Sequence, residues 1–115
     1  MDSTTFNSRY RTRLEKLSTT NLSDAMDSVG VSGAVSGVRP MFDAPRVVGR
    51  AVTIKITAAG EKKSSSHLGV EAIASCHQGD VIVVSNHGDT RNNCWGEVLS
   101  CAAKVKGVSG VVIDG

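Results

Sequence analysis

Two adjacent residues, Gly96 and Glu97, have the types and position best suited to chemistry in this sequence. They open a segment with helical character that runs to about Lys106. The first amides of such a helix have no acceptor within the helix and lie at the positive end of its dipole. These amides belong to Gly96, Glu97, Val98 and Leu99. They can hold a carboxylate or an enolate, and Gly96 has no side chain to keep a ligand from the backbone. The alternative is that Gly96 is only a cap and Glu97 only a favourable first-turn carboxylate.

The polar loop before this helix, residues 86 to 94, carries further candidates. His87, Asp89 and Arg91 lie in it. Arg91 is the best candidate for the distal carboxylate of a dicarboxylic keto acid, because a guanidinium forks onto carboxylate oxygens. The alternative is a loop that is simply solvated.

Cysteine and histidine chemistry is the next possibility, since the sequence has three of each. Their spacings match neither the CxxC nor the HxxxH pattern of structural zinc sites, which argues against a zinc cluster. Cys94 precedes the helix start, where a thiolate would be stabilised, although an ordinary cysteine is the alternative. Cys76 and Cys101 fall on expected helices at positions that suit small core residues. The odd cysteine count, with no signal peptide or membrane span in the sequence, predicts a reducing, cytoplasmic setting without disulfides.

The elements that must position these residues can be read from apolar spacing. Steps of four, four and three predict a helix over residues 5 to 17, and Asn21 is expected to cap a short helix that Gly30 closes. Residues 47 to 57 alternate, which predicts a strand with one wet face. Ser66 is expected to cap a helix from His67 to about Cys76. The residues expected to share a side of that helix are Val70, Ile73, Ala74 and His77.

The C-terminal third predicts a βαβ unit. Residues 81 to 85 and 110 to 114 are apolar runs, typical of strands buried on both faces, and the helix that starts at Gly96 connects them. In parallel strands the carboxyl ends meet at one edge, so the helix start should lie near Asp114 and Gly115. The sequence therefore predicts an α/β fold with short N-terminal helices and a ligand crevice at this edge.

The totals limit the remaining possibilities. A chain of 115 residues, 40% hydrophobic and 21% charged, suits one small domain, which we place at residues 1 to 115. The net charge of +2 is too small to indicate a nucleic-acid or membrane surface. We therefore expect a small-molecule ligand, with no membrane and no direct nucleic acid.

Four blocks, in register, resemble the RraA-like family. They are DAMDSVG (24 to 30), VVGRAVTIK (47 to 55), EAIASCHQGDVIVV (71 to 84) and WGEVLSCAAKVKGVSGVVIDG (95 to 115). That family includes the class II pyruvate aldolases that act on 4-hydroxy-4-methyl-2-oxoglutarate and 4-carboxy-4-hydroxy-2-oxoadipate. The resemblance implies a swivelling β/β/α-type domain.

The family's aldolases have Gly-Asp or Gly-Glu, then twenty residues, then Arg-Asp. Gly96-Glu97 matches the first pair, and counting on places the Arg and the metal-binding Asp at the third and fourth positions after Gly115. The resemblance therefore assigns no metal ligand within this sequence. We expect the chain to be the N-terminal part of a longer protein, and inactive alone.

The mechanism implied by the resemblance uses a divalent Mg or Mn ion that polarises the keto acid. The Arg and the helix amides would hold the carboxylate and the enolate, and Glu97 would position a water or relay a proton. Oxaloacetate decarboxylase activity would follow from the shared pyruvate enolate. The resemblance also implies a homotrimer or hexamer with the active site between protomers.

Two other functions stay open at the level of sequence. Some relatives of the same fold are non-enzymatic regulators that bind ribonuclease E, and the missing Arg-Asp pair leaves that function possible. A catalytically dead domain is the third possibility. Gly96-Glu97 behind a tryptophan favours the aldolase.

Overall fold

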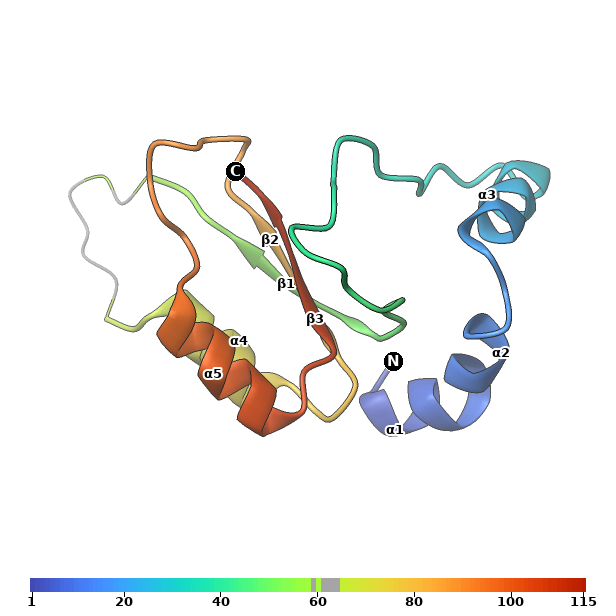
Figure 1. The fold of residues 1–115 in the computed structure, drawn as a ribbon, viewed down its shortest axis with the longest axis horizontal. Coiled ribbons are helices and arrows are strands. Elements are labelled where there is room, and N and C mark those ends of the chain that lie inside the picture. Colours follow the sequence, from blue (N-terminus) through green and yellow to red (C-terminus); the bar gives the residue numbers. More distant parts are fainter. Residues whose placement is uncertain (59, 61–64) are drawn as a thin grey trace. The chain divides into compact units, whose positions relative to one another are not determined.

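The computed structural model describes residues 1–58, 60 and 65–115. Residues 59 and 61–64, between the strand expected over residues 47 to 57 and the helix expected from His67, lie outside the described residues. The chain divides into two compact units, Met1–Arg46 and Val47–Gly115. Figure 1 shows the elements of both units, and each unit is described by itself. That the whole chain is a single domain stays a prediction.

The first unit begins with three consecutive helical segments, as the apolar stripe over residues 5 to 17 predicts. They are α1 (Ser3–Phe6), a π-helical turn η1 (Asn7–Arg11) and α2 (Thr12–Leu14). The Asp2 carboxylate caps the start by accepting the Thr5 amide at 2.8 Å. At the other end, the Arg46 guanidinium donates to the carbonyl oxygens of Glu15, at 3.1 Å, and Leu17, at 2.8 Å. Orphan carbonyls after the last turn are thereby satisfied.

The next helix, α3 (Thr19–Ser28), starts earlier than predicted. Its cap is Ser18 and not Asn21, because the two form a reciprocal capping box: the Asn21 amide donates to Ser18 Oγ at 3.1 Å, and the Ser18 amide to Asn21 Oδ1 at 3.0 Å. Gly30 closes the helix as predicted, with a φ of 69°. The Gly30 and Val31 amides bond back into the last turn, which is a Schellman motif.

The second unit alternates strands and helices in the order predicted. It contains β1 (Ala51–Lys55), α4 (Leu68–Ser75), β2 (Val81–Ser85), α5 (Glu97–Lys106) and β3 (Gly110–Asp114). The strands form one parallel sheet in the order β1-β2-β3, with β2 in the centre. Figure 1 shows α4 and α5 side by side along this sheet. The predicted α/β class and the C-terminal βαβ unit are confirmed.

The core lies between the sheet and the two helices. Its buried members are Ile54, Ala72, Ile73, Cys76, Ile82, Val84 and Ala103. The predicted alternation of the first strand is confirmed, since Val52, Ile54 and Ile56 all belong to or pack on this cluster. In β2 only Ile82 and Val84 are buried, while the intervening side chains are half-buried. The prediction that this strand is buried on both faces was therefore wrong: its burial alternates.

Helix α4 differs from the prediction at its cap. His67, and not Ser66, is the N-cap residue, and its Nδ1 atom accepts the Gly69 amide at 3.2 Å. His67 is one residue closer to the first turn than Ser66. Its imidazole accepts a first-turn amide, which is the hydrogen bond that a capping serine would otherwise make.

The buried face of α4 also differs from the prediction. Gly69, Ala72, Ile73 and Cys76 are buried, whereas Val70 is 56% exposed. One reason is the close approach of α5: a Cβ atom on Gly69 would lie 2.8 Å from Leu99 Cδ1, so a side chain at this position would require the Leu99 side chain to shift. Ile73 and three small residues therefore form the buried side of α4, while Val70 stays in solvent.

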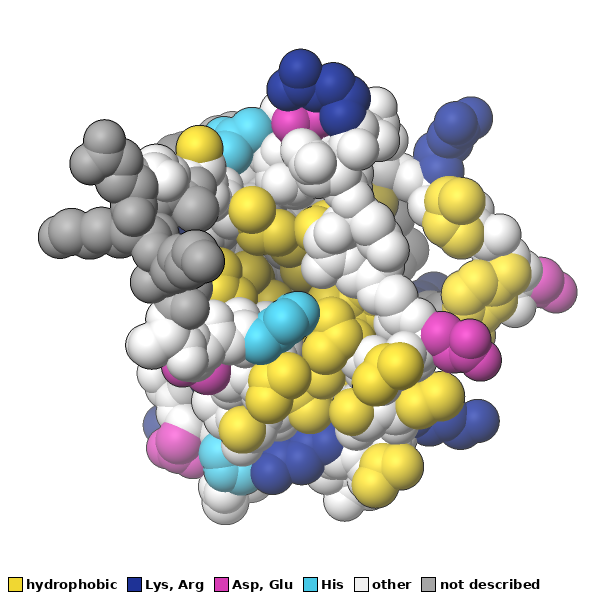
Figure 2. Space-filling view, turned by 90° about the vertical axis from the view of Figure 1, so that its left-hand side faces the viewer, with side chains coloured by type: hydrophobic (Ala, Val, Ile, Leu, Met, Phe, Trp, Pro, Cys, Tyr) yellow, Lys and Arg dark blue, Asp and Glu magenta, His cyan; other side chains and the backbone are white. Residues whose placement is uncertain are grey.

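The surface of these two helices keeps several apolar side chains in solvent. They are Leu68, Val70, Val98 and Val105, with exposures of 45%, 56%, 83% and 90%. Figure 2 views the molecule from the side on which α4 and α5 lie in Figure 1, and hydrophobic side chains gather on that face. Cys101 is exposed as well, so its predicted core position was wrong, while Cys76 is buried as predicted. Exposed apolar groups of this kind are typical of surfaces that meet another molecule.

An ion pair with a buried carboxylate and a partly exposed guanidinium joins the amino ends of β1 and β2. Arg50 Nη2 lies 2.6 Å from Asp80 Oδ2, and Arg50 Nε lies 3.3 Å from Asp80 Oδ1. The Asp80 side chain is only 2% exposed and also accepts the His77 amide at 2.9 Å. Burial, and secondarily the charge of Asp80, raises the pKa of the neighbouring Cys76 thiol. The pair thus holds two strands and the turn after α4 together.

Gly49, just before β1, sits where no side chain fits, and this predicts a large effect of substitution. A Cβ atom there would collide with the Gly79 carbonyl oxygen and lie 2.8 Å from Val81 Cγ2. Gly49→Ala should lower the free energy of unfolding by about 1–3 kcal/mol, measured by chemical denaturation. Adding Val81→Ala should restore only part of the loss, because the carbonyl remains. An unchanged denaturation midpoint would contradict this packing.

No helix within the described residues is long and apolar enough to cross a membrane.

Candidate functional site

The segment between β2 and α5 passes the end of β3, as the parallel topology requires. The Asn86 amide donates to the Asp114 carbonyl at 2.9 Å, which joins the start of the loop to the last residue of β3. The Cys94 thiol lies 3.8 Å from the Gly115 carbonyl oxygen, near the start of α5. Figure 1 shows the loop running from β2 past the carboxyl end of β3 to α5. The carboxyl edge of the sheet therefore brings both ends of this loop beside the last residues.

A tight turn at residues 86 to 89 begins the loop. The Asp89 amide donates to the Asn86 carbonyl at 3.0 Å, and Asn86 Nδ2 donates to the Asp89 carbonyl at 2.7 Å. Asn86 is 7% exposed. His87 and Gly88 both have positive φ, 55° and 68°, as in the turns that favour Asn and Gly. His87 itself is exposed, so its backbone shapes the turn while its imidazole faces solvent.

Arg91 forms a bidentate pair with Asp89. Arg91 Nε lies 2.9 Å from Asp89 Oδ1, and Arg91 Nη2 lies 2.9 Å from Asp89 Oδ2. The Arg91 amide donates to the same carboxylate at 3.0 Å. The guanidinium is 86% exposed, so it faces solvent on its other side. The sequence did not predict that Asp89 and Arg91 would bind each other.

This pairing predicts a measurable titration. The Arg91 side chain, then its amide, lowers the pKa of Asp89 from 3.8 to about 2. The folded pKa is depressed, so the pair's contribution is present above about pH 4 and is lost as the pH falls through about 2. Arg91→Ala should raise the Asp89 pKa toward 3.8, measured by carboxyl carbon NMR. Arg91→Lys, which keeps the charge without the fork, should give an intermediate pKa; no change in either variant would contradict the pairing.

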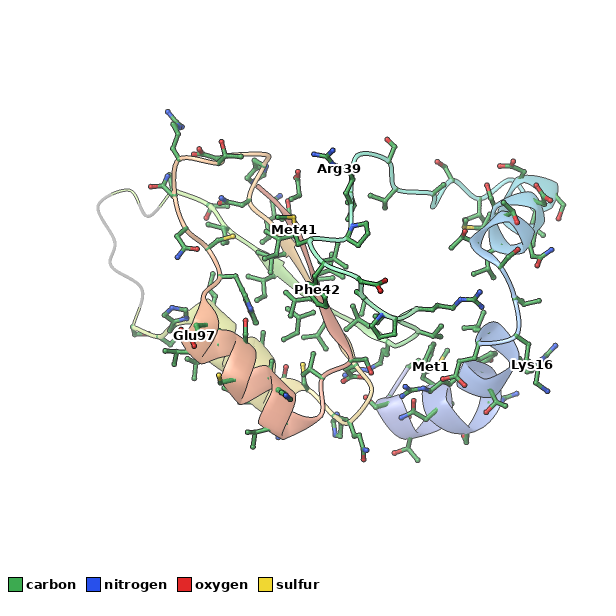
Figure 3. The ribbon with its side chains drawn as sticks, in the orientation of Figure 1. Met1, Lys16, Arg39, Met41, Phe42 and Glu97 are labelled. Carbon is green, nitrogen blue, oxygen red and sulfur yellow. The ribbon has the colours of Figure 1, made fainter. Side chains whose placement is uncertain are left out.

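The start of α5 presents open backbone amides. Gly96 is the N-cap residue in an extended conformation, and no side chain of the described residues caps this helix. A Cβ atom on Gly96 would meet only Asn93 Nδ2, at 3.9 Å. Glu97 is exposed, and Figure 3 shows it at the first turn of α5. The backbone here is therefore accessible to a small ligand, as the position of Gly96 predicts.

The two residues that follow Glu97 differ in their side chains. Val98 is 83% exposed, whereas Leu99 is half-buried and packs on the core. The Leu99 side chain packs close to Gly69 of α4, while its backbone amide belongs to the first turn of α5. The helix tip is thereby fixed by packing.

Trp95 does more than precede the helix. Its indole Nε1 donates to Ser100 Oγ at 3.0 Å, and Ser100 Oγ donates to the Gly96 carbonyl at 3.0 Å. The ring also packs on the core cluster. The hydrogen bond from Trp95 to Ser100 was not predicted. The sequence hints at it only in that a serine follows the tryptophan five residues later.

The described residues offer few side chains that could bind a metal ion together. Within residues 1–58, 60 and 65–115, no group of three or more His, Cys, Asp or Glu side chains could hold a metal ion. The cysteines are free, with Cys94 half-buried. The chain's own described side chains therefore do not fit a complete metal site. What the carboxyl edge offers is a set of backbone donors at the start of α5, which suit a small anion, together with the exposed carboxylates of Glu97 and Asp114.

Known proteins match this chain in sequence and in structure. The family model described as RraA-like, aldolase/RraA, matches residues 19–115. A protein of Halalkalibacterium halodurans named "Putative 4-hydroxy-4-methyl-2-oxoglutarate aldolase" is 32% identical over 107 residues, covering 92% of this chain and 47% of that protein. Protein DlpA of Legionella pneumophila is 28% identical over 94 residues, covering 82% of this chain and 15% of DlpA.

A solved structure shares the fold. It is the crystal structure of an uncharacterized protein from Pseudomonas syringae pv. tomato, with a TM-score of 0.74 and 32% sequence identity. The match covers 91% of this chain and 47% of that one. The chain thus spans less than half the length of each of these three proteins.

Proposed function

The chain belongs to the RraA-like family, and on that premise we propose that it forms part of a class II pyruvate aldolase. The reaction would cleave 4-hydroxy-2-oxo dicarboxylic or tricarboxylic acids and release pyruvate. The observation that carries the proposal is the open tip of α5, where Gly96 and Glu97 stand at the carboxyl edge of the sheet. The aldolase name of the Halalkalibacterium relative supports the same reaction class.

Each candidate residue has a role in the proposal. The amides of Glu97, Val98 and Leu99 would hold the carboxylate and the enolate that forms when the carbon–carbon bond breaks, which places donors where negative charge develops. The exposed Glu97 carboxylate would relay a proton or position a water. Arg91 would contact the distal carboxylate through Nη1, since its pair with Asp89 uses Nε and Nη2.

The proposed cofactor is Mg or Mn, which would stabilise the enolate as a Lewis acid. The Asp that would bind this ion is expected just beyond Gly115, together with the Arg that directly precedes it in the family's Arg-Asp pair. Because the described side chains provide no complete metal site, we assign no step of the reaction to the ion.

The proposal also covers a second activity, the assembly of the protein and its location. Oxaloacetate decarboxylase activity would use the same enolate. Assembly into a homotrimer or hexamer is supported by the exposed apolar side chains of α4 and α5. A cytoplasmic location stays a prediction from the cysteine content of the sequence.

The test is an assay of pyruvate release from 4-hydroxy-4-methyl-2-oxoglutarate with Mg or Mn. It compares the chain as given with a version extended so that Arg-Asp occupies the third and fourth positions after Gly115. We expect metal-dependent release from the extended version only. If neither version releases pyruvate and oxalate shifts no amide of residues 97–99 in NMR spectra, the aldolase proposal is wrong. Measured binding to ribonuclease E would then support the alternative function, a non-enzymatic regulator.

A further inference from the structure

The outer side of α5 carries an apolar stripe that the described residues leave in solvent. Its members are exposed side chains at the spacing i, i+3, i+4 and i+7: Val98, Cys101, Ala102 and Val105. This spacing places them along one face of the helix, over about 10 Å of its length. Leu99 and Ala103 pack on the core from the other face. Helix α5 therefore has two apolar faces, and the outer stripe is the one that meets water.

Opposite charges lie at the two ends of the outer stripe. Glu97 belongs to the first turn of α5 and Lys104 to the last. Both are exposed, and their separation of seven residues places them on the same flank of the stripe. A second α5 that ran in the opposite direction would set its lysine against Glu97 and its glutamate against Lys104. A second α5 in the same direction would set like charges together.

The apolar side chains of the outer stripe are arranged symmetrically as well. The midpoint of the stripe falls between Cys101 and Ala102, and a valine stands at each end. An antiparallel copy centred on this point brings each Val98 toward Val105 of the other copy. The small side chains then lie at the crossing, where they allow two helix axes to approach to about 8 Å. A surface that matches itself in this way suits a two-fold contact.

We propose that the outer stripe of α5 binds a second copy of this chain, with the two α5 helices packed antiparallel around a two-fold axis near Cys101 and Ala102. The inference does not rest on the aldolase reaction. It also goes beyond the proposed trimer, because a two-fold contact joins copies in pairs and a three-fold ring needs a different surface. The open amides of α5 point along the helix axis, so a contact on its side leaves them free.

The first test measures self-association of the chain as given, without substrate. Sedimentation velocity from about 10 µM to about 1 mM covers the affinities of a small interface. Val105→Glu should weaken the dimer about 10-fold or more, because it removes a buried valine from the contact. Val35→Glu, at a valine of the first unit that is 80% exposed, is the matched control and should leave the dissociation constant unchanged. Thermal unfolding checks that both variants fold.

A charge exchange tests the antiparallel direction. Lys104→Glu should weaken the dimer about threefold or more, because it sets a new carboxylate against Glu97 of the other copy. Adding Glu97→Lys should restore the dimer, since opposite charges then meet again at both ends. High salt should reduce the difference between the single variant and the exchange. No substrate is present, so the proposed catalytic role of Glu97 does not enter the measurement.

Cys101 reports the position of the two-fold axis. An axis near Cys101 brings the two thiols of the dimer close to the distance that a disulfide spans. Oxidised glutathione should therefore link wild-type chains through Cys101, and Val105→Glu should lower the yield. Thr90→Cys combined with Cys101→Ala moves the exposed thiol to a loop and serves as the control for random collisions. Its yield should be several times lower than that of the wild type.

Three results would overturn the proposal. A wild-type chain that stays monomeric up to about 1 mM would show that the stripe does not bind its own copy. Equal self-association of the wild type and Val105→Glu would show that copies meet through another face. A charge exchange that binds no better than Lys104→Glu would rule out the antiparallel contact. None of these results depends on pyruvate release, so the aldolase proposal stands or fails separately.

Discussion

Asp80→Ala should lower the free energy of unfolding by about 3 kcal/mol or more, measured by urea denaturation. Removing one partner of a buried ion pair costs about 3–5 kcal/mol, because the other charge loses its compensation. Arg50 is partly exposed, at 27%, so water can solvate it in part, which places the expected loss toward the lower end. The His77 amide would lose its acceptor in the same change.

The matched control is Asp89→Ala, which removes another aspartate of the second unit that is paired with an arginine. That pair lies on an exposed loop, with Arg91 86% exposed, so its loss should change the denaturation midpoint little. The combination of Arg50→Met with Asp80→Leu should be milder than Asp80→Ala, since it removes both charges of the pair together. If Asp80→Ala and Asp89→Ala cost the same, burial does not set the strength of the pair.

Glu97→Gln should lower pyruvate release by about 100-fold or more in the extended version of the chain. A positioned acid or base contributes about 10² to 10⁴ in rate, and glutamine keeps the size of the side chain but cannot take up a proton. Because Glu97 is exposed at the first turn, the stability cost should be small. The measurement is kcat for pyruvate release, with thermal unfolding as the check on folding.

Glu71→Gln is the matched control for this change. Glu71 is the acidic residue in the first turn of α4, as Glu97 is in α5, so both variants lose the same favourable interaction with a helix dipole. We expect Glu71→Gln to keep the wild-type kcat. If Glu97→Gln also keeps it, Glu97 has no part in proton transfer, and the amides alone carry the proposal.

The order of elements could be predicted because each depends on local pattern. Residues 81 to 85 and 110 to 114 are strands with the predicted bounds, and Gly30 and Gly107 end their helices with positive φ. Aliphatic runs and glycines of this kind act within a few residues of themselves. The parallel pairing follows, because a ten-residue helix returns the chain to the start of the next strand.

The faces and the pairings could not be predicted in the same way. The buried side of α4 was misplaced because it depends on how closely α5 approaches Gly69, a distance that spacing does not contain. Ser18 and Asn21 are both good capping residues, and only their reciprocal bonds decide which is the cap. The ion pair of Asp89 with Arg91 could not be predicted either, because it depends on how the backbone folds in the turn at residues 86 to 89.

The sequence by itself determined the α/β class, the βαβ unit and the place of Gly96 and Glu97 at the start of a helix, since these follow from periodicity and from the geometry of parallel strands. Only the tertiary structure decided what surrounds that helix start. Asn93, Trp95 and Ser100 meet there through side-chain hydrogen bonds, which depend on positions in space and leave no periodic signal in the chain.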